Sequence, residues 1–170
     1  LKFMHDTNNL HLDLKPLNVL IIGIDNRTAK LTDFGISLNM ENGNSKYYPI
    51  ELVTVTHRPP EVLKGSREYT RSTDIWSLGI IFLEVMSMGK QIFKDFSKTT
   101  VKNTINKLFN ERDINNTLDT YLIDLPEHMK PIKSIIKRML SMNPSVRPTT
   151  NEILKSPMFV TMPITAGNIL

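Results

Sequence analysis

The pattern of hydrophobic and polar positions predicts buried helices in the second half of the chain. The longest apolar run, about a dozen residues over 75–86, holds one charged residue, Glu84, and is too short for a membrane span of roughly 20 residues. A second stretch, 129–142, carries one helical stripe of apolar side chains: Ile132, Ile135, Ile136, Met139 and Leu140. Both stretches are expected to be core helices.

Turn and capping residues mark the other helices. Pro59-Pro60 starts a short helix in the favoured way. The long apolar helix is expected to be capped by Ser72 or Thr73, to run to about Met88 and to end at Gly89. Further helical segments are expected over 1–5, 99–110 and 151–155, with a polar bridge over 111–119.

Strands are expected in one place. The β-branched run Val-Leu-Ile-Ile at 19–22, turn residues at 23–28 and a return strand at 29–32 form a small hairpin. Residues 36–50 show no clean period and contain Asn-Gly-Asn, so they are expected to form a loop. The predicted fold class is mainly α with a small β-hairpin.

Composition narrows the classes of partner and site. The net charge of +4 is spread along the chain, which disfavours nucleic acid as a partner and leaves a helical DNA-binding domain with little support. The chain has no cysteine, so disulfides and thiol zinc sites are excluded. No signal peptide or membrane segment is visible, so a cytoplasmic or nuclear protein is expected. The first residue is Leu1, in the middle of an apolar pattern, which indicates a fragment.

Candidate chemistry is concentrated in residues 11–18, His-Leu-Asp-Leu-Lys-Pro-Leu-Asn. Within six residues they supply the carboxylate of Asp13, the ammonium of Lys15 and the carboxamide of Asn18, with Pro16 stiffening the backbone. An acid accepts a proton, a cation holds a phosphate and an amide oxygen binds a metal. Phosphoryl transfer needs all three.

Four further motifs follow in order. Asp33-Phe34-Gly35 comes twenty residues after Asp13; an acid at the end of a strand can bind a magnesium ion held by phosphates. The others are Pro59-Pro60-Glu61, Asp74-Ile75-Trp76-Ser77-Leu78-Gly79, and Arg147 within Asn-Pro-Ser-Val-Arg-Pro.

Together these motifs resemble the C-terminal lobe of eukaryotic-type serine/threonine protein kinases. Residues 51–61, 143–147 and 156–159 are most similar to the cyclin-dependent kinase branch. The resemblance implies an α+β family fold whose N-terminal lobe is missing. It covers 1–159 as a partial kinase domain and leaves 160–170 as a C-terminal tail.

The resemblance implies that Glu61 and Arg147 form a buried ion pair, and it also implies roles for other residues. Asp13 would orient or deprotonate the substrate hydroxyl, and Lys15 would steady the transferred phosphoryl group and contact ATP. Asn18 and Asp33 would hold Mg²⁺ and contact the nucleotide. Thr54 would hydrogen-bond near Asp13 and Lys15 and is counted with the catalytic residues.

Three more side chains receive a role from the resemblance. Leu20 would lie beneath the adenine ring of ATP, although a plain core leucine is an equal alternative. Asp74 would bind the backbone of the catalytic stretch, and His11 would be a packed, hydrogen-bonded residue, not a base.

The chain departs from the family where a phosphorylated loop is normally gripped. Leu12 replaces an arginine, Leu38 replaces another, and Pro49 stands where the phosphorylated threonine is expected. Activation by phosphorylation at that position is therefore not expected. Arg58 matches an arginine that supports the loop carrying Val53 in proline-directed kinases, which implies Ser/Thr-Pro substrates.

Two functions remain open. The first is an ATP-dependent serine/threonine kinase acting on protein substrates; a cyclin-like regulatory subunit is left undecided. The second is a truncated or degenerate kinase that serves as a binding lobe. No glycine-rich loop, strand lysine or glutamate helix precedes Leu1, so the 170 residues alone are not expected to transfer phosphate.

Overall fold

The computed structural model describes residues 1–23, 28–40, 45–49, 51–90 and 92–160. Its α-helices are α1 (Lys2–Asp6), α2 (Pro60–Leu63), α3 (Arg71–Met86), α4 (Lys98–Leu108), α5 (Ile114–Tyr121), α6 (Ile132–Met139), α7 (Thr150–Leu154) and α8 (Pro157–Val160). Its strands are β1 (Asn9–Leu10), β2 (Val19–Ile22), β3 (Thr28–Leu31), β4 (Leu38–Asn39), β5 (Lys46–Tyr47) and β6 (Glu68–Tyr69). The expectation of a mainly helical chain with little β-structure is confirmed.

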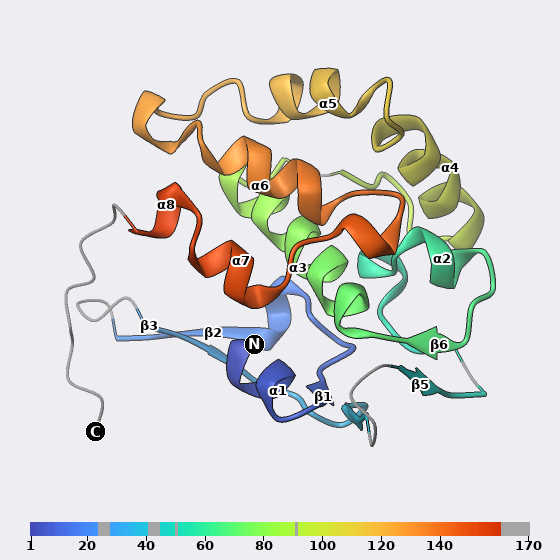
Figure 1. Cartoon of the computed structure of the whole chain (residues 1–170). Helices are drawn as coiled ribbons and strands as arrows, with labels where there is room; N and C mark the ends of the chain where they lie inside the picture. Colours follow the sequence, from blue (N-terminus) through green and yellow to red (C-terminus); the bar gives the residue numbers. More distant parts are fainter. Residues whose placement is uncertain (24–27, 41–44, 50, 91, 161–170) are drawn as a thin grey trace.

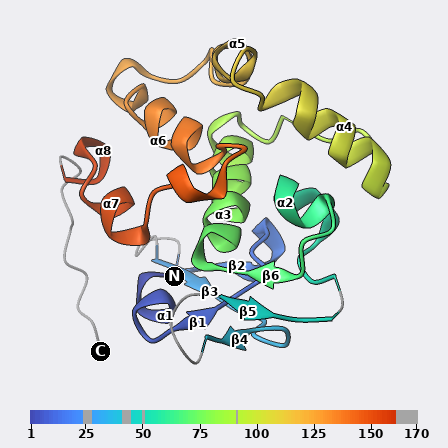
Figure 2. The ribbon, with the colours of Figure 1, turned by 45° about the vertical axis from the view of Figure 1, so that its right-hand side comes forward.

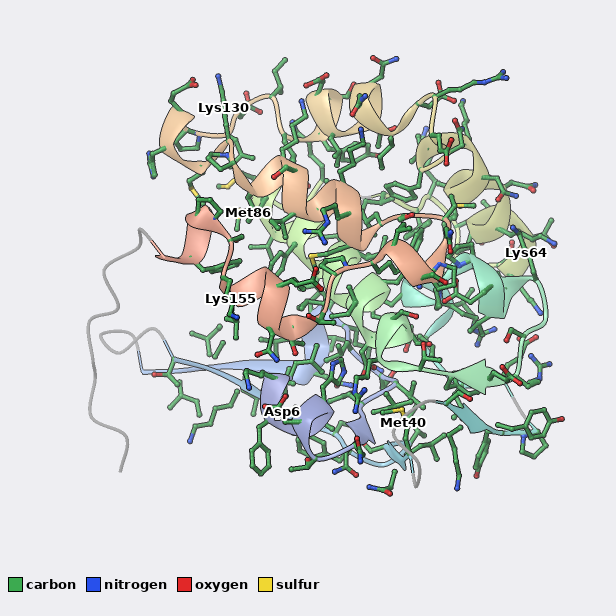
Figure 3. The ribbon with its side chains drawn as sticks, viewed as in Figure 1. Asp6, Met40, Lys64, Met86, Lys130 and Lys155 are labelled. Carbon is green, nitrogen blue, oxygen red and sulfur yellow. The ribbon has the colours of Figure 1, made fainter. Side chains whose placement is uncertain are left out.

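Helix α3 runs through the middle of the molecule (Figure 1). Helices α4, α5 and α6 cover one side of it, and the short strands with α1 lie on the other, as the turned view also shows (Figure 2). Charged side chains such as Lys64, Lys130 and Lys155 extend from the outside (Figure 3). The central helix therefore joins the helical layer to the strands.

The core is built around α3 because its apolar residues are buried on several sides. Trp76, Ile80 and Leu83 are fully buried and share one cluster with residues from α4, α5 and α6. The Trp76 and Phe109 rings meet edge to face at 5.7 Å, a favoured aromatic geometry. Each buried side chain of this size contributes roughly 1.5–3 kcal/mol. No helix in the described ranges is long and apolar enough to cross a membrane.

Both ends of α3 differ from the expected positions. The N-cap is Thr70, and its backbone N–H donates to the Thr73 hydroxyl at 3.3 Å, so Thr73 takes part in the cap from inside the helix. At the other end, the helix stops at Met86. Met88 and Gly89 then adopt positive φ of 56° and 78°, and the Gly89 N–H bonds the Glu84 carbonyl at 2.9 Å.

The expected hairpin is present as β2 and β3, paired antiparallel from Val19↔Leu31 to Ile22↔Thr28. The connecting residues 24–27 lie outside the described residues. Two strands, β4 and β5, lie within the stretch expected to be a loop, and they pair with β1 and β6, which lie outside it. Their partners lie far apart in the chain, so no local pattern could reveal them.

The polar bridge expected over 111–119 is wrong because most of it is helical. Helix α5 buries Ile114 and Leu118, four residues apart, and the Thr117 hydroxyl donates to the Leu108 carbonyl at 2.7 Å. Asn115 and Asn116 between these positions are exposed, and these polar residues hide the helical stripe in the sequence. Helix α6 is shorter than expected and begins at Ile132, after Pro131.

Gly79 allows α3 and α6 to pack closely. A Cβ at this position would lie 2.9 Å from Leu140 Cδ2 and 3.0 Å from Met139 Cβ. We expect Gly79→Ala to destabilise the fold by about 1–3 kcal/mol through overpacking, measured by urea unfolding. Val85→Ala, on the exposed side of the same helix, is the control and should stay within about 0.5 kcal/mol. Equal stability of Gly79→Ala and the parent chain would contradict this packing.

Candidate active site

The stretch 11–18 is held in place by the buried carboxylate of Asp74 on α3. Asp74 is fully buried and accepts hydrogen bonds from the backbone N–H groups of His11 (2.9 Å) and Leu12 (2.8 Å). His5 Nε2, on α1, lies 2.9 Å from the same carboxylate. These contacts offset the cost of burying the charge. The loop position therefore depends on the central helix.

Three side chains converge on Asp13. Lys15 Nζ lies 2.6 Å from Asp13 Oδ2, and the Thr54 hydroxyl donates to Oδ1 at 2.6 Å. Asn18 Nδ2 donates to the Asp13 carbonyl at 2.8 Å and to Oδ2 at 3.0 Å. Lys15 Nζ also reaches Thr54 Oγ1 at 3.4 Å. Residues 41 positions apart thus form one polar cluster around a carboxylate.

These contacts also set the ionisation of Asp13. Partial burial by itself would raise its pKa, but the hydrogen bonds from Lys15 and Thr54, the charge of Lys15 and the hydrogen bond from Asn18 outweigh burial, and the pKa lies below its ordinary value. Asp13 is therefore ionised at neutral pH and can accept a hydrogen bond or a proton.

Leu20 and Asp33 lie on the hairpin and on the segment that leaves it. The Thr32 backbone connects this segment to the stretch: its N–H donates to the Asn18 carbonyl at 3.0 Å, and its carbonyl lies 3.1 Å from His11 Nε2. Asp33 follows with φ 63° and is exposed. Leu20 is half exposed, which leaves its side chain available to a ligand.

The donor set fits magnesium. The Asn18 side chain uses its amide N–H₂ to hold Asp13, and among the described residues no donor is bound to its side-chain oxygen. Within the same part of the chain, the Asp33 carboxylate receives one long bond, 3.4 Å, from Gly35 N–H. Mg²⁺ is usually held by one or two protein oxygens together with phosphate and water. The described part of the chain has no group of three His, Asp or Glu side chains suited to a metal. Asn18 and Asp33 thus suit an ion shared with phosphates.

A short loop carries Thr54 to the cluster. Val53 has a left-handed backbone, φ 71°, and its carbonyl accepts hydrogen bonds from Arg58 Nε (3.0 Å) and Nη2 (2.8 Å). The backbone of a β-branched residue is strained in this conformation. Arg58 Nη1 also lies 2.5 Å from Glu51 Oε2. Arg58 therefore fixes the residue next to Thr54.

An apolar cluster surrounds Leu12, and Leu38 packs against it. Leu12 is fully buried and belongs to a cluster with Leu10, Met40, Leu52, Val53, Val62 and Tyr69. Leu38 packs against this cluster, and Met40 lies among the strands in Figure 3. Pro49 is exposed. Leu12 and Leu38 thus belong to one packed group of apolar side chains.

The expected ion pair of Glu61 with Arg147 is present. Arg147 Nη1 and Nη2 donate to Glu61 Oε1 and Oε2, each at 2.7 Å, in bidentate geometry. The Arg147 side chain is fully buried, while that of Glu61 keeps 21% exposure. Arg147 also donates to the Ser141 and Ser72 carbonyls and stacks on Trp76 at 5.0 Å. This network joins α2, α3 and the segment before α7.

Some supporting residues had no recognisable sequence signal. His5 binds Asp74 from 69 positions away, and Arg67 and Lys98 both bind Glu51. Short-range spacing cannot reveal such contacts. His57 lies 3.6 Å from Glu84.

A sequence model of the protein kinase domain matches residues 1–159. Cyclin-dependent kinase 2 from Caenorhabditis elegans is 44% identical over 93 residues, which make up 55% of this chain and 24% of that protein. The chain thus spans about a quarter of the length of this relative.

Proposed function

From the premise that this chain belongs to the protein kinase family and is similar to cyclin-dependent kinases, we propose that it forms the catalytic C-terminal lobe of an ATP-dependent serine/threonine kinase. The observation that carries the proposal is the ionised carboxylate of Asp13, held between Lys15 and Thr54. Protein kinases need a carboxylate to receive the substrate hydroxyl and a cation near the phosphoryl group. This cluster supplies both.

In the proposed reaction the hydroxyl oxygen of a serine or threonine attacks the γ-phosphorus of ATP, and the bond from that phosphorus to the bridging oxygen of ADP breaks. Asp13 accepts the hydroxyl proton, and Lys15 faces the charge that accumulates on the phosphoryl oxygens. Thr54 keeps the Asp13 carboxylate oriented through its hydrogen bond. Asn18 and Asp33 would hold Mg²⁺, and the bound ion would supply positive charge against the phosphates.

The remaining parts of the proposal concern the longer protein. Residues 1–159 would be the part of the kinase domain that holds these groups, with Leu20 beneath the adenine. Residues 161–170 of the proposed tail lie outside the described residues. Proteins bearing serine or threonine would be the substrates, and a cyclin-like subunit is a partner to be tested.

The test is phosphoryl transfer from Mg-ATP by the longer protein in which this chain would form the C-terminal lobe. Serine and threonine peptides should be labelled and matched tyrosine peptides should not, with and without an added cyclin. A well-folded protein that labels none of them under either condition would overturn the proposal. It would favour a binding lobe without catalysis, for which the replacement at Leu12 is the supporting observation.

Proline after the acceptor is expected to raise kcat/KM. With its carbonyl bound by Arg58, Val53 offers no backbone acceptor toward the substrate, so proline, which lacks an N–H, loses nothing there. Any other residue at that position leaves its N–H without a partner. This costs about 1–3 kcal/mol, which lowers kcat/KM roughly fivefold to more than a hundredfold. Paired peptides with proline or alanine after serine measure the ratio. A ratio near one would contradict the proposed role of Arg58.

Phosphorylation of the segment before Glu51 is expected to leave activity unchanged. Leu12 is packed among apolar side chains, and Pro49 has no hydroxyl to modify, so an added phosphate would meet no arginine from position 12. Activity of the longer protein before and after phosphatase treatment should agree within about twofold. A large loss after phosphatase, restored by a kinase, would show that another residue serves as a phosphate switch.

A further inference from the structure

Glu51 is the centre of a cationic cluster beside the loop that carries Thr54. Its carboxylate pairs with Arg58 (2.5 Å), with Arg67 (3.2 Å) and with Lys98. These cations come from three separate places: the loop itself, the residue before β6, and the first turn of α4. Helix α2, strand β6 and the start of α4 lie on the same side of the molecule (Figures 1 and 2).

The cluster has more positive than negative charge. Three cations surround one carboxylate, and the described residues include no other carboxylate within ion-pairing distance of Arg58, Arg67 or Lys98. The pKa of Glu51 lies below its ordinary value, and the largest cause is the hydrogen bond from Lys98. Burial opposes this lowering of the pKa, while the charges of Arg58 and Lys98 add to it. Glu51 thus remains a single negative charge at neutral pH, and the net charge is two positive.

The excess charge is on the surface. Arg58 is buried, and its guanidinium is committed to the Val53 carbonyl and to Glu51, which it balances. Arg67 and Lys98 have side chains 27% and 44% exposed. Each uses only part of its N–H donors on Glu51. The two surplus charges therefore belong to the side chains that solvent, or a ligand, can reach.

The centre of the cluster lies on the same loop that the proposed function places beside a bound peptide. Thr54 contacts Asp13, Val53 is the next residue along the loop, and Glu51 is two residues further. An extended peptide advances about 3.3 Å per residue. With its acceptor hydroxyl at Asp13 and the following residue at Val53, its next residues would approach Arg67 and Lys98.

We propose that Arg67 and Lys98 form a subsite for an anionic side chain, a carboxylate or a phosphate, two or three residues after the phosphoacceptor. This inference rests on the proposed function, because the direction of the peptide is set by the acceptor at Asp13. It defines the substrate class as Ser/Thr sites followed by an acidic or previously phosphorylated residue. The surplus charge supplies attraction without requiring displacement of Glu51.

The test is binding of fluorescent Ser-Pro peptides to the 170-residue chain, followed by anisotropy at low and high salt. The peptides carry glutamate, phosphoserine, alanine or lysine at the third position after serine, with a second set for the second position. The glutamate peptide is expected to bind about three- to tenfold tighter than the lysine peptide, and the difference should shrink in high salt because exposed charges are screened. Comparison of the phosphoserine peptide with the glutamate peptide shows whether a phosphate or a carboxylate is preferred.

Lys98→Glu and Arg67→Gln should each reduce the preference severalfold, and Lys98→Glu should bring the glutamate and lysine peptides close to equal. Lys107→Glu makes the same change in net charge on α4, where Lys107 is exposed in the last turn, and should keep the preference. Circular dichroism checks that each variant remains folded.

The outcomes separate the subsite from the catalytic proposal. Equal binding of the four peptides, or a preference lost equally in Lys107→Glu, would overturn the subsite even if the longer protein transfers phosphate. A preference lost only in Lys98→Glu and Arg67→Gln supports the subsite even if no transfer is found. Failure of every peptide to bind in millimolar amounts would also count against it.

Discussion

Replacing Asp13 by asparagine is expected to lower kcat for phosphoryl transfer by about 10²–10⁴-fold in the longer protein. Asparagine has nearly the same shape and can still accept hydrogen bonds from Thr54 and Lys15, but it cannot take the substrate proton. The fold should remain intact because Asp13 lies at the surface of the cluster, partly exposed. Initial rates with Mg-ATP and a serine peptide measure the effect.

Asp6→Asn is the matched control because it removes an exposed carboxylate that pairs only with Lys2 in the described structure. Its kcat should stay within about twofold of the parent value, since exposed pairs contribute little. The lowered pKa of Asp13 keeps its carboxylate ionised at neutral pH. A decline in kcat near neutral pH would therefore belong to another group, and kcat within fivefold of the parent value in Asp13→Asn would exclude Asp13 as the base.

Replacing Arg147 by alanine is expected to destabilise the chain by about 3–5 kcal/mol. The change leaves the Glu61 carboxylate without its bidentate partner, and it removes the Arg147 hydrogen bonds to the Ser72 and Ser141 carbonyls and the cation stacked on Trp76. Because Glu61 keeps 21% exposure, the lower end of this range is expected. The free energy of unfolding in urea measures the effect.

Arg138→Ala is the control for this prediction. Arg138 pairs with Glu152, but both side chains are about half exposed, at 48% and 52%, so the loss should be below about 1 kcal/mol. The double variant Glu61→Gln with Arg147→Met should recover part of the stability, because no charge is then left alone. Equal losses for Arg138→Ala and Arg147→Ala would show that burial does not distinguish the two pairs.

The sequence predicted best those features that depend on neighbouring residues. The β2–β3 hairpin and the apolar stripe of α6 are visible as local periods, and the cluster of Asp13, Lys15 and Asn18 lies within six residues. Thr54 joined this cluster only through the family resemblance. Its contact with Asp13 depends on how the loop after Glu51 folds back.

The features that were missed depend on contacts between distant segments. Strands β4 and β5 pair with partners outside their own stretch, and the helical stripe of α5 is masked by polar residues on its outer side. The carboxylate of Glu51 meets Lys98 from 47 positions away. Secondary-structure propensity carries no information about such long-range contacts, because they form only when the whole core packs.

The attachment of the catalytic stretch to Asp74 has a consequence for its motion. Loops usually open on their own, at little cost in free energy, while core helices open only when the whole fold is lost. Here the amides of His11 and Leu12 belong to an irregular stretch, yet their acceptor is a fully buried carboxylate of the central helix. This part of the loop therefore shares the cooperative unit of the helix, and its hydrogen exchange would follow global unfolding, not local fraying.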